Sequence, residues 1–163
     1  MSFKIDMQGG DFFSAKLLIT NGDPNPAEGN QKISEVVDLS NDESSCNPLK
    51  DFPIDLQQAC GGLINDSMIL ICGGFDSSEN GDSNKCFLVN GPSEPVAYMK
   101  FQRNLPGCTV INDTLLWMTG GFNELQHHKT TEFIDLTTQL AVAGPDLPAE
   151  LYVRYDSHIT TDT

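Results

Sequence analysis

The five cysteines, at positions 46, 60, 72, 86 and 108, are the residues whose spacing most clearly predicts chemistry. Cys72 ends one apolar stretch, residues 68–72, and Cys86 lies at the start of the next, residues 85–89. If these stretches are antiparallel neighbours, the two Cα atoms come within the distance that a disulfide requires. We therefore predict a disulfide between Cys72 and Cys86; two buried free thiols are the alternative. Cys46 and Cys60, also 14 residues apart, could bridge two units and leave Cys108 unpaired, and we do not predict that bond.

Two tripeptides match the acceptor pattern for N-glycosylation, Asn65-Asp66-Ser67 and Asn112-Asp113-Thr114. Turn chemistry explains both Asn-Asp pairs equally well, since Asn and Asp tolerate the backbone of tight turns. Glycans and a disulfide would both require an oxidising, secretory compartment. Residues 1–7 hold neither a basic head followed by an apolar run nor a cleavage site, so no secretory leader can be read there. The compartment stays open, and the two sequons with the predicted disulfide favour an extracellular location.

Two polar segments have some of the features of metal sites. Residues 76–82 place oxygen-bearing side chains at alternate positions before a Gly, as a calcium loop begins, but the closing position holds Phe87 rather than Glu. We expect a solvated polar loop there. His127 and His128 are adjacent and would point to opposite faces of a strand, so we expect an exposed loop pair rather than shared ligands.

The chain contains no Gly-x-Ser-x-Gly elbow, no phosphate-cradling glycine loop and no carboxylate pair whose spacing marks an acid and a base. We therefore predict no catalytic residue, no cofactor, no metal site and no enzymatic activity.

The net charge argues against one class of partner. Nine basic and 23 acidic residues give a net charge of −14, and such a surface repels a phosphate backbone. We expect no nucleic-acid binding, and solubility explains the acidic surface better than a dedicated basic partner does. The longest apolar stretches, residues 68–72 and 115–118, are far shorter than the roughly 20 residues of a membrane helix. We predict no membrane span.

The segments that must position these residues are repeats. Residues 59–75 and 106–122 align without a gap at an offset of 47, and both contain an Asn-Asp pair and end in Gly-Gly-Phe. The Asn-Asp pairs predict hairpin turns. The doublets Gly73-Gly74 and Gly120-Gly121 permit unusual φ values and close approach of a neighbouring backbone. A third, more divergent copy precedes them and ends at Gly22.

A third strand follows each doublet after a polar loop of variable length, and a short fourth segment with a Pro-bearing link closes the unit. The third strands are residues 35–39, 85–89 and 132–136. The second strands are apolar on consecutive residues, so we expect them to be buried on both faces. Because no segment shows a helical period, we predict an all-β chain.

The repeats also bear on the predicted disulfide. In this alignment both cysteine positions hold other residues in the remaining units: Thr119 and Phe133 in the third, Thr20 and Val36 in the first. The two cysteines are therefore gained or lost together, which favours a bond between them.

Four short strands per unit, a Gly-Gly doublet closing the second strand and a period of about 47 to 52 residues resemble the kelch repeat. The resemblance implies that each unit is a four-stranded antiparallel blade of a β-propeller. It covers nearly the whole chain and is most specific at the two Gly-Gly doublets. One departure concerns the aromatic residues, because the family usually carries a Trp near the fourth strand and the single Trp here, Trp117, lies in a second strand. The predicted fold is an all-β, partial kelch-type β-propeller.

The units predict blades at residues 8–56, 57–105 and 106–150 and the start of a further blade at 151–163. A closed propeller needs about four to eight blades, since each blade buries its faces only against neighbours. We therefore expect this sequence to be a fragment of a longer protein; ring completion through self-association of open blade faces is the alternative.

The kelch resemblance implies a non-catalytic protein–protein interaction module with an unidentified protein partner. Its interface would lie on the variable loops around 75–84 and 122–129, together with the Asn-Asp turns on whichever face they share. A secreted or matrix-associated structural propeller protein is the alternative, and a fragment of a propeller enzyme is a third reading. Fold alone does not decide among them.

Overall fold

A computed structural model describes residues 2–7, 14–20, 32, 34–38, 46–65, 68–124 and 126–150. For residues 2–7, 14–20, 36–38, 46–47 and 65 it describes the backbone alone. Every regular element in these ranges is a β-strand and the strand pairs are antiparallel, which confirms the predicted all-β class. The predicted start of a further blade, residues 151–163, lies outside the described residues.

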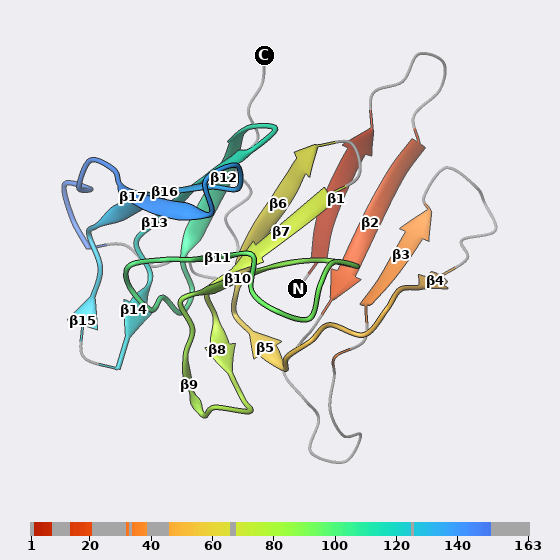
Figure 1. Ribbon diagram of the computed structural model, residues 1–163, viewed down its shortest axis with the longest axis horizontal. Coiled ribbons are helices and arrows are strands. Elements are labelled where there is room, and N and C mark those ends of the chain that lie inside the picture. Colours follow the sequence, from red (N-terminus) through yellow and green to blue (C-terminus); the bar gives the residue numbers. More distant parts are fainter. Residues whose placement is uncertain are drawn as a thin grey trace.

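Three four-stranded sheets make up most of the structure (Figure 1). Sheet I consists of β1 (Ser2–Met7), β2 (Ser14–Thr20), β3 (Ser34–Asp38) and β4 (Cys46–Pro48). Sheet II consists of β6 (Cys60–Asn65), β7 (Met68–Cys72), β10 (Lys85–Leu88) and β11 (Ala97–Tyr98). Sheet III consists of β12 (Gly107–Asn112), β13 (Leu115–Thr119), β16 (Thr131–Asp135) and β17 (Leu140–Ala143). Within each sheet the strands pair in chain order.

Two small hairpins follow the Gly-Gly doublets. The first doublet hairpin consists of β8 (Phe75–Asp76) and β9 (Gly81–Asp82), and β5 (Leu56–Gln57) pairs with its first strand. The second doublet hairpin consists of β14 (Phe122–Asn123) and β15 (Gln126–His127). Figure 1 shows both hairpins below the large sheets, whereas the end of β6, the start of β7 and the turn from β12 to β13 lie at the top.

The β6–β7 and β12–β13 hairpins share the irregularity expected of true repeats. In both pairs the register shifts by one residue just before the turn, between Leu63 and Asn65 and between Val110 and Asn112. Such a bulge inserts one residue into one strand and increases the local twist. The same local sequence therefore produces the same local distortion twice.

The two second strands differ in burial. Residues 69–72 of β7 are all buried, as expected for a strand covered on both faces. In β13 only Leu116 and Met118 are buried, and the residues between and beside them are half-buried. The expectation of two buried faces is therefore wrong for β13, because sheet II covers one of its faces and the other carries the half-buried Trp117.

The core lies on both faces of sheet II. One face packs against sheet III through a buried cluster that includes Leu70, Cys72, Cys86, Leu116, Met118 and Ile134. The other face carries Ile69, Ile71 and Phe87 against Phe52 and Leu56 from the link that precedes β6. Truncating one such buried Leu or Ile to Ala would cost about 2–5 kcal/mol. Sheet II is thus the central layer of the described structure.

The first strands of sheets II and III lie side by side. A Cβ added to Gly62 in β6 would come within 2.6 Å of Val110 Cγ2 in β12. Real Cβ atoms do not approach that closely, so any larger residue at position 62 would force the Val110 side chain to shift. This close approach also brings the cysteines of β6 and β12 together.

The register corrects one part of the repeat alignment. Cys86 in β10 opposes Cys72, and the residues in the same place in sheets III and I are Thr131, which opposes Thr119, and Ser34, which opposes Thr20. The matches of Cys86 to Phe133 and Val36 were therefore wrong by two residues. A two-residue slip leaves the apolar alternation unchanged, because strand side chains repeat every two residues. The cysteine pair still occurs in one unit only.

Candidate functional site

The Gly-Gly doublets turn the chain out of β7 and β13 with backbone angles that favour glycine. The φ values are 70° and 88° at Gly73 and Gly74, and 58° and 82° at Gly120 and Gly121. Space is also restricted, since a Cβ on Gly74 would collide with the carbonyl oxygen of Gln57. The doublets therefore fix the direction in which each hairpin leaves its sheet.

The first doublet hairpin is held by a buried carboxylate. Asp76, 1% exposed, accepts hydrogen bonds from the Ser78 backbone N–H at 3.0 Å and from the Ser78 hydroxyl at 2.5 Å. Lys85 Nζ lies 3.8 Å from Asp76 Oδ2 and 2.5 Å from Glu79 Oε1. The hydrogen bond to Glu79 is the main reason that the pKa of Lys85 is raised. The base of the hairpin is thus fixed, while Ser78, Glu79 and Asn80 stay exposed at its tip.

Asp82 and Asn104 join the two doublet hairpins. The Asn104 side chain and the Glu124 backbone N–H both donate hydrogen bonds to the Asp82 carboxylate. Asn104 and Phe122 exchange backbone hydrogen bonds of 2.7 and 2.9 Å. Burial raises the pKa of Asp82 despite these donors. These contacts therefore connect the base of the first doublet hairpin, where Asp82 lies opposite Phe75, to the second doublet hairpin.

His128 lies beneath the second doublet hairpin. Its backbone N–H donates to the Gly121 carbonyl at 2.8 Å, and its ring packs against Phe101 with ring centroids 5.6 Å apart. The side chain is 2% exposed, and burial lowers its pKa, followed by the nearby charge of Arg103. The expectation of an exposed histidine pair is wrong for His128, because the hairpin backbone turns this side chain inward, and holds for His127, which is exposed.

A buried ion pair attaches the chain segment between sheets II and III to sheet III. Arg103, 0% exposed, donates to Glu132 Oε1 from Nε at 3.1 Å and from Nη2 at 2.8 Å. It also donates to the Gly120 carbonyl at 2.6 Å and to the Thr130 carbonyl at 3.0 Å. Glu132, 1% exposed, accepts a further bond from the Lys100 backbone N–H at 2.6 Å. Multiple donors and acceptors of this kind allow charges to be buried.

The sequence reasoning missed this pair, although the repeats contain a signal. Leu56 lies 47 residues before Arg103, and the residues two positions after each have positive φ, 55° at Gln58 and 48° at Leu105. Ile71 and Met118 occupy matching positions in the two repeats. Phe87 opposes Ile71 and Glu132 opposes Met118, so Phe87 matches Glu132. Leu56 and Phe87 are both 1% exposed and belong to one cluster. The same two positions are therefore ionic in one repeat and apolar in the preceding one.

The structure brings four cysteines together in two pairs. Cys72 and Cys86, the pair predicted from the sequence, oppose each other in β7 and β10 with Cα atoms 4.1 Å apart. Cys60 pairs with Cys108, Cα to Cα 6.0 Å, rather than with Cys46. Both distances allow a disulfide, and such pairs are compatible with an extracellular location. Aligning the repeats could not reveal the Cys60–Cys108 pair, because Cys108 lies one residue away from the position that aligns with Cys60.

The two predicted glycosylation positions lie at the end of the sheets opposite the doublet hairpins. Asn112 is exposed in the turn from β12 to β13, where its Oδ1 accepts hydrogen bonds from the Thr114 N–H at 3.0 Å and hydroxyl at 3.3 Å. The side chain of Asn65 and both following residues lie outside the described part of the chain. The Asn112 turn and the second doublet hairpin therefore lie at opposite ends of sheet III. Glycosylation of Asn65 and Asn112 stays a prediction.

Within the described residues, no three or more His, Cys, Asp or Glu side chains are grouped so that they could hold a metal ion. The described part of the chain also contains no helix long and apolar enough to cross a bilayer.

Comparison with known proteins finds a solved structure with a similar arrangement of strands. No protein-family model matches the chain, and no curated protein sequence matches it. Among solved structures, the chain is similar to YjhT, with a TM-score of 0.67 and 15% sequence identity. The match covers 82% of this chain and 49% of YjhT, so the chain corresponds to about half the length of that protein. At this identity the likeness concerns the arrangement of the strands.

Proposed function

We propose that this chain is part of a kelch-like β-propeller and serves as a non-catalytic protein–protein interaction module. The partner is a protein, and it contacts the exposed tips of the two doublet hairpins. The observation that supports this most directly is the contrast between buried anchors and exposed, dissimilar tips. Binding loops on a rigid scaffold need that combination.

The anchors are the buried polar groups that join the hairpins to the sheets and to each other. Asp76, Asp82 and Asn104 are 1%, 8% and 6% exposed. The tips carry different side chains, with Ser78, Glu79 and Asn80 exposed on the first and Glu124 and Gln126 exposed on the second. Since the backbone is held from below, these side chains can bind a partner without a large ordering cost.

The propeller assignment rests on three observations. Each large sheet is a four-stranded antiparallel meander, the first strands of sheets II and III lie side by side, and the chain resembles half of YjhT. In this proposal sheets I, II and III are three blades, and more blades complete the ring. They belong to a longer parent protein, or they come from self-association of this chain.

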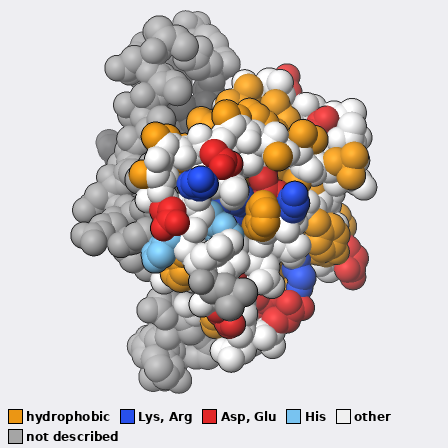
Figure 2. Space-filling view, turned by 90° about the vertical axis from the view of Figure 1, so that its left-hand side faces the viewer, with side chains coloured by type: hydrophobic (Ala, Val, Ile, Leu, Met, Phe, Trp, Pro, Cys, Tyr) orange, Lys and Arg blue, Asp and Glu red, His pale blue; other side chains and the backbone are white. Residues whose placement is uncertain are grey.

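In this proposal the next blade packs on the face of sheet III that no other described sheet covers. Trp117 and Phe133 stack there with centroids 6.1 Å apart, and Val142 lies opposite Phe133. Val142 is 60% exposed and its neighbour Leu140 is 62% exposed. Figure 2 views the side of the molecule that bears sheet III and shows hydrophobic side chains gathered over its upper part. An apolar surface of this kind typically marks an interface.

Charge reversal at one hairpin tip tests the proposed interface. Glu124→Arg changes the second doublet hairpin, and Asp113→Arg makes the same change in an exposed turn at the opposite end of sheet III. Partners are captured from the native source by proximity labelling, and their affinities for the purified proteins are then measured. We expect Glu124→Arg to weaken binding at least about tenfold and Asp113→Arg to leave it unchanged. Equal binding by both variants, or turnover of a substrate by the complete propeller, would overturn the proposal.

The two cysteine pairs favour a second candidate, a secreted or matrix-associated structural propeller. It differs from the first in compartment, and the native protein decides between them. We expect the four paired cysteines to be alkylated only after reduction, and the mass to fall on glycosidase treatment if Asn65 or Asn112 carries a glycan. Free thiols at these four positions in native material would place the protein in a reducing compartment instead.

A further inference from the structure

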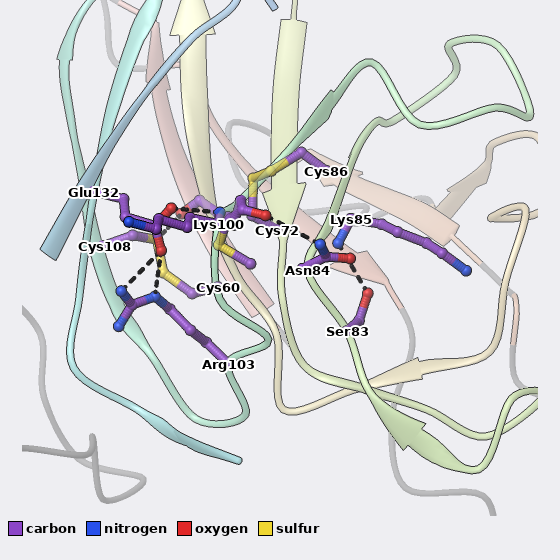
Figure 3. Close-up of a disulfide and its surroundings, with 12 residues drawn as sticks. Cys60, Cys72, Ser83, Asn84, Lys85, Cys86, Lys100, Arg103, Cys108 and Glu132 are labelled. Atoms are coloured by element: carbon purple, nitrogen blue, oxygen red, sulfur yellow. Dashed lines mark hydrogen bonds and ion pairs between the residues drawn. A yellow bond between two sulfur atoms is a disulfide. The ribbon is translucent and has the colours of Figure 1, made fainter. Parts of the chain in front are cut away.

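Three of the paired cysteines form a single row across sheet II. Cys60 opposes Cys72 in the β6–β7 pair, and Cys72 opposes Cys86 in the β7–β10 pair. Directly opposed residues of antiparallel strands point to the same face of the sheet. The row therefore lies on one face, the face that packs against sheet III, and Cys108 of β12 meets it there. Figure 3 shows the four side chains gathered at this junction.

Cys60 therefore has a second cysteine within reach. The Val96 N–H donates to the Cys86 carbonyl at 2.8 Å, so the peptide groups of Cys86 point away from β7. Cys72 and Cys86 thus form a non-hydrogen-bonded pair, in accord with their short Cα separation of 4.1 Å. The peptide groups of Cys72 then point toward β6, and in such hydrogen-bonded pairs the Cα atoms lie about 5.5 Å apart. That Cα separation is within the range that a disulfide accepts, and formation of the bond requires the two Cβ atoms, roughly 5.5 Å apart in such a pair, to move about 1 Å closer.

The two disulfides differ in their access to solvent. Cys72 and Cys86 are both 0% exposed, whereas Cys60 and Cys108 are half-buried. A reducing thiolate must reach a sulfur atom of the bond that it attacks. An external reductant therefore reaches the Cys60–Cys108 bond first.

We propose that Cys60, Cys72, Cys86 and Cys108 form a thiol–disulfide exchange site whose external substrate is a dithiol reductant. One thiolate of the reductant attacks the Cys60–Cys108 bond and forms a mixed disulfide. Its second thiol then displaces the protein sulfur, so that the reductant leaves as a disulfide and two electrons and two protons stay on Cys60 and Cys108.

The second step is internal and requires no further reductant. The Cys60 thiolate attacks Cys72 Sγ, a Cys60–Cys72 bond forms, the Cys72–Cys86 bond breaks, and Cys86 leaves as a thiolate that takes up a proton. The covalent link between sheets II and III is lost, while sheet II keeps one disulfide between two of its strands. The site thereby converts an external redox signal into the coupling of two neighbouring sheets.

Two variants that remove the same inter-sheet bond test the exchange. Cys108→Ser leaves Cys60 free beside Cys72, whereas Cys60→Ser leaves Cys108 on the other sheet. Both carry Cys46→Ser, so that the fifth cysteine takes no part. The folded proteins are held at about pH 8, where an ordinary thiol is partly ionised, then alkylated and digested with trypsin without reduction.

Cleavage after Lys50, Lys85 and Lys100 separates the two states. The Cys72–Cys86 bond joins the peptides 51–85 and 86–100, whereas a Cys60–Cys72 bond lies within 51–85 and releases 86–100 with one alkyl group. We expect at least about ten times more of this alkylated peptide from Cys108→Ser than from Cys60→Ser.

Two results would overturn the proposal: peptides 51–85 and 86–100 that stay linked in Cys108→Ser, or equal release of 86–100 from both variants. Should either variant fail to fold, the protein with only Cys46→Ser is titrated with dithiothreitol while its fold is monitored. Loss of the 60–108 link before any loss of structure, followed by alkylation of Cys86, is expected. Simultaneous loss of both disulfides would contradict the proposal.

Discussion

Replacing Arg103 by leucine tests whether the buried ion pair holds the link between sheets II and III. Arg103→Leu copies Leu56, the residue at the matching position one repeat earlier, and Glu132→Phe copies Phe87 in the same way. The chain thus supplies its own apolar version of the pair. Comparing the single and double replacements measures how strongly the two charges depend on each other.

The expected magnitudes follow from the contacts. Arg103→Leu leaves the Glu132 carboxylate, 1% exposed, with the Lys100 N–H as its remaining donor among the bonds described above. Removing one partner of a buried pair costs about 3–5 kcal/mol. The Gly120 carbonyl loses its 2.6 Å donor in both variants. The double variant also removes the uncompensated carboxylate, at the cost of the acceptor of the Lys100 N–H, about 1–3 kcal/mol. We therefore expect the double variant to be more stable than Arg103→Leu by at least about 1 kcal/mol.

Urea unfolding under non-reducing conditions measures these differences. Trp117 is the single tryptophan and stacks on Phe133, the residue after Glu132, so its fluorescence reports on the site. The wild type, the two single variants and the double variant form a double-mutant cycle. Their free energies of unfolding are compared only if all four depend on urea concentration with the same slope, because a changed slope would signal a different unfolded or folded state.

Two results would refute the reasoning. One is a loss below about 1 kcal/mol for Arg103→Leu, which is the level of an exposed pair. The other is an additive cycle, since a buried pair must couple its two members. If Arg103→Leu does not fold, Arg103→Lys keeps the positive charge but lacks the planar fork, and we expect a smaller, measurable loss.

Other predictions concern the first doublet, the buried histidine and the disulfides. Gly74→Ala would place a Cβ against the Gln57 carbonyl at a φ of 88°, so we expect thermal unfolding to show a loss of stability of at least about 1 kcal/mol. Gly81→Ala, where the nearest atom is 3.9 Å from the added Cβ, is the control, and its stability should stay near that of the wild type. Because burial lowers the pKa of His128 below 6.5, the unfolded chain binds more protons there, and stability should fall as the pH drops through and below that value. His128→Gln should weaken this dependence of stability on pH between about pH 7 and pH 5, whereas replacing the exposed His127 by Gln should not. If the stability of both variants falls equally steeply with pH, His128 is not the group responsible. Reduction of both disulfides should lower the free energy of unfolding by at least about 2 kcal/mol, measured by urea unfolding with and without reductant.

Features encoded by local sequence could be predicted, because hairpin turns and strand periodicity depend on neighbouring residues. The Asn-Asp turns and the doublets at Gly73 and Gly120 end the strands where the repeat alignment expected them to end. The third strands were placed correctly in the chain but matched two residues out of register between units. A pattern of period two cannot detect such a slip.

Features that depend on packing between repeats were not predictable in this way. Arg103 and Glu132 are 29 residues apart, and the slipped alignment paired Glu132 with Lys85 instead of Phe87. The polar sequence around His128 suggested an exposed loop, whereas the hairpin folds its ring onto Phe101. Contacts of this kind arise between elements whose relative position no local pattern specifies.

The bond between Cys60 and Cys108 has a mechanical consequence. It connects residues 48 positions apart, so the chain between them forms a closed loop that contains the whole of sheet II. When the two ends of the oxidised protein are pulled, tension passes through the sulfur atoms directly from β6 to β12. The residues between the two cysteines, which hold the rest of sheet II, then bear no load. The fully extended chain is shorter by about 160 Å than the reduced one, at roughly 3.4 Å per residue. The central layer of the fold is thus shielded from force for as long as this bond remains oxidised.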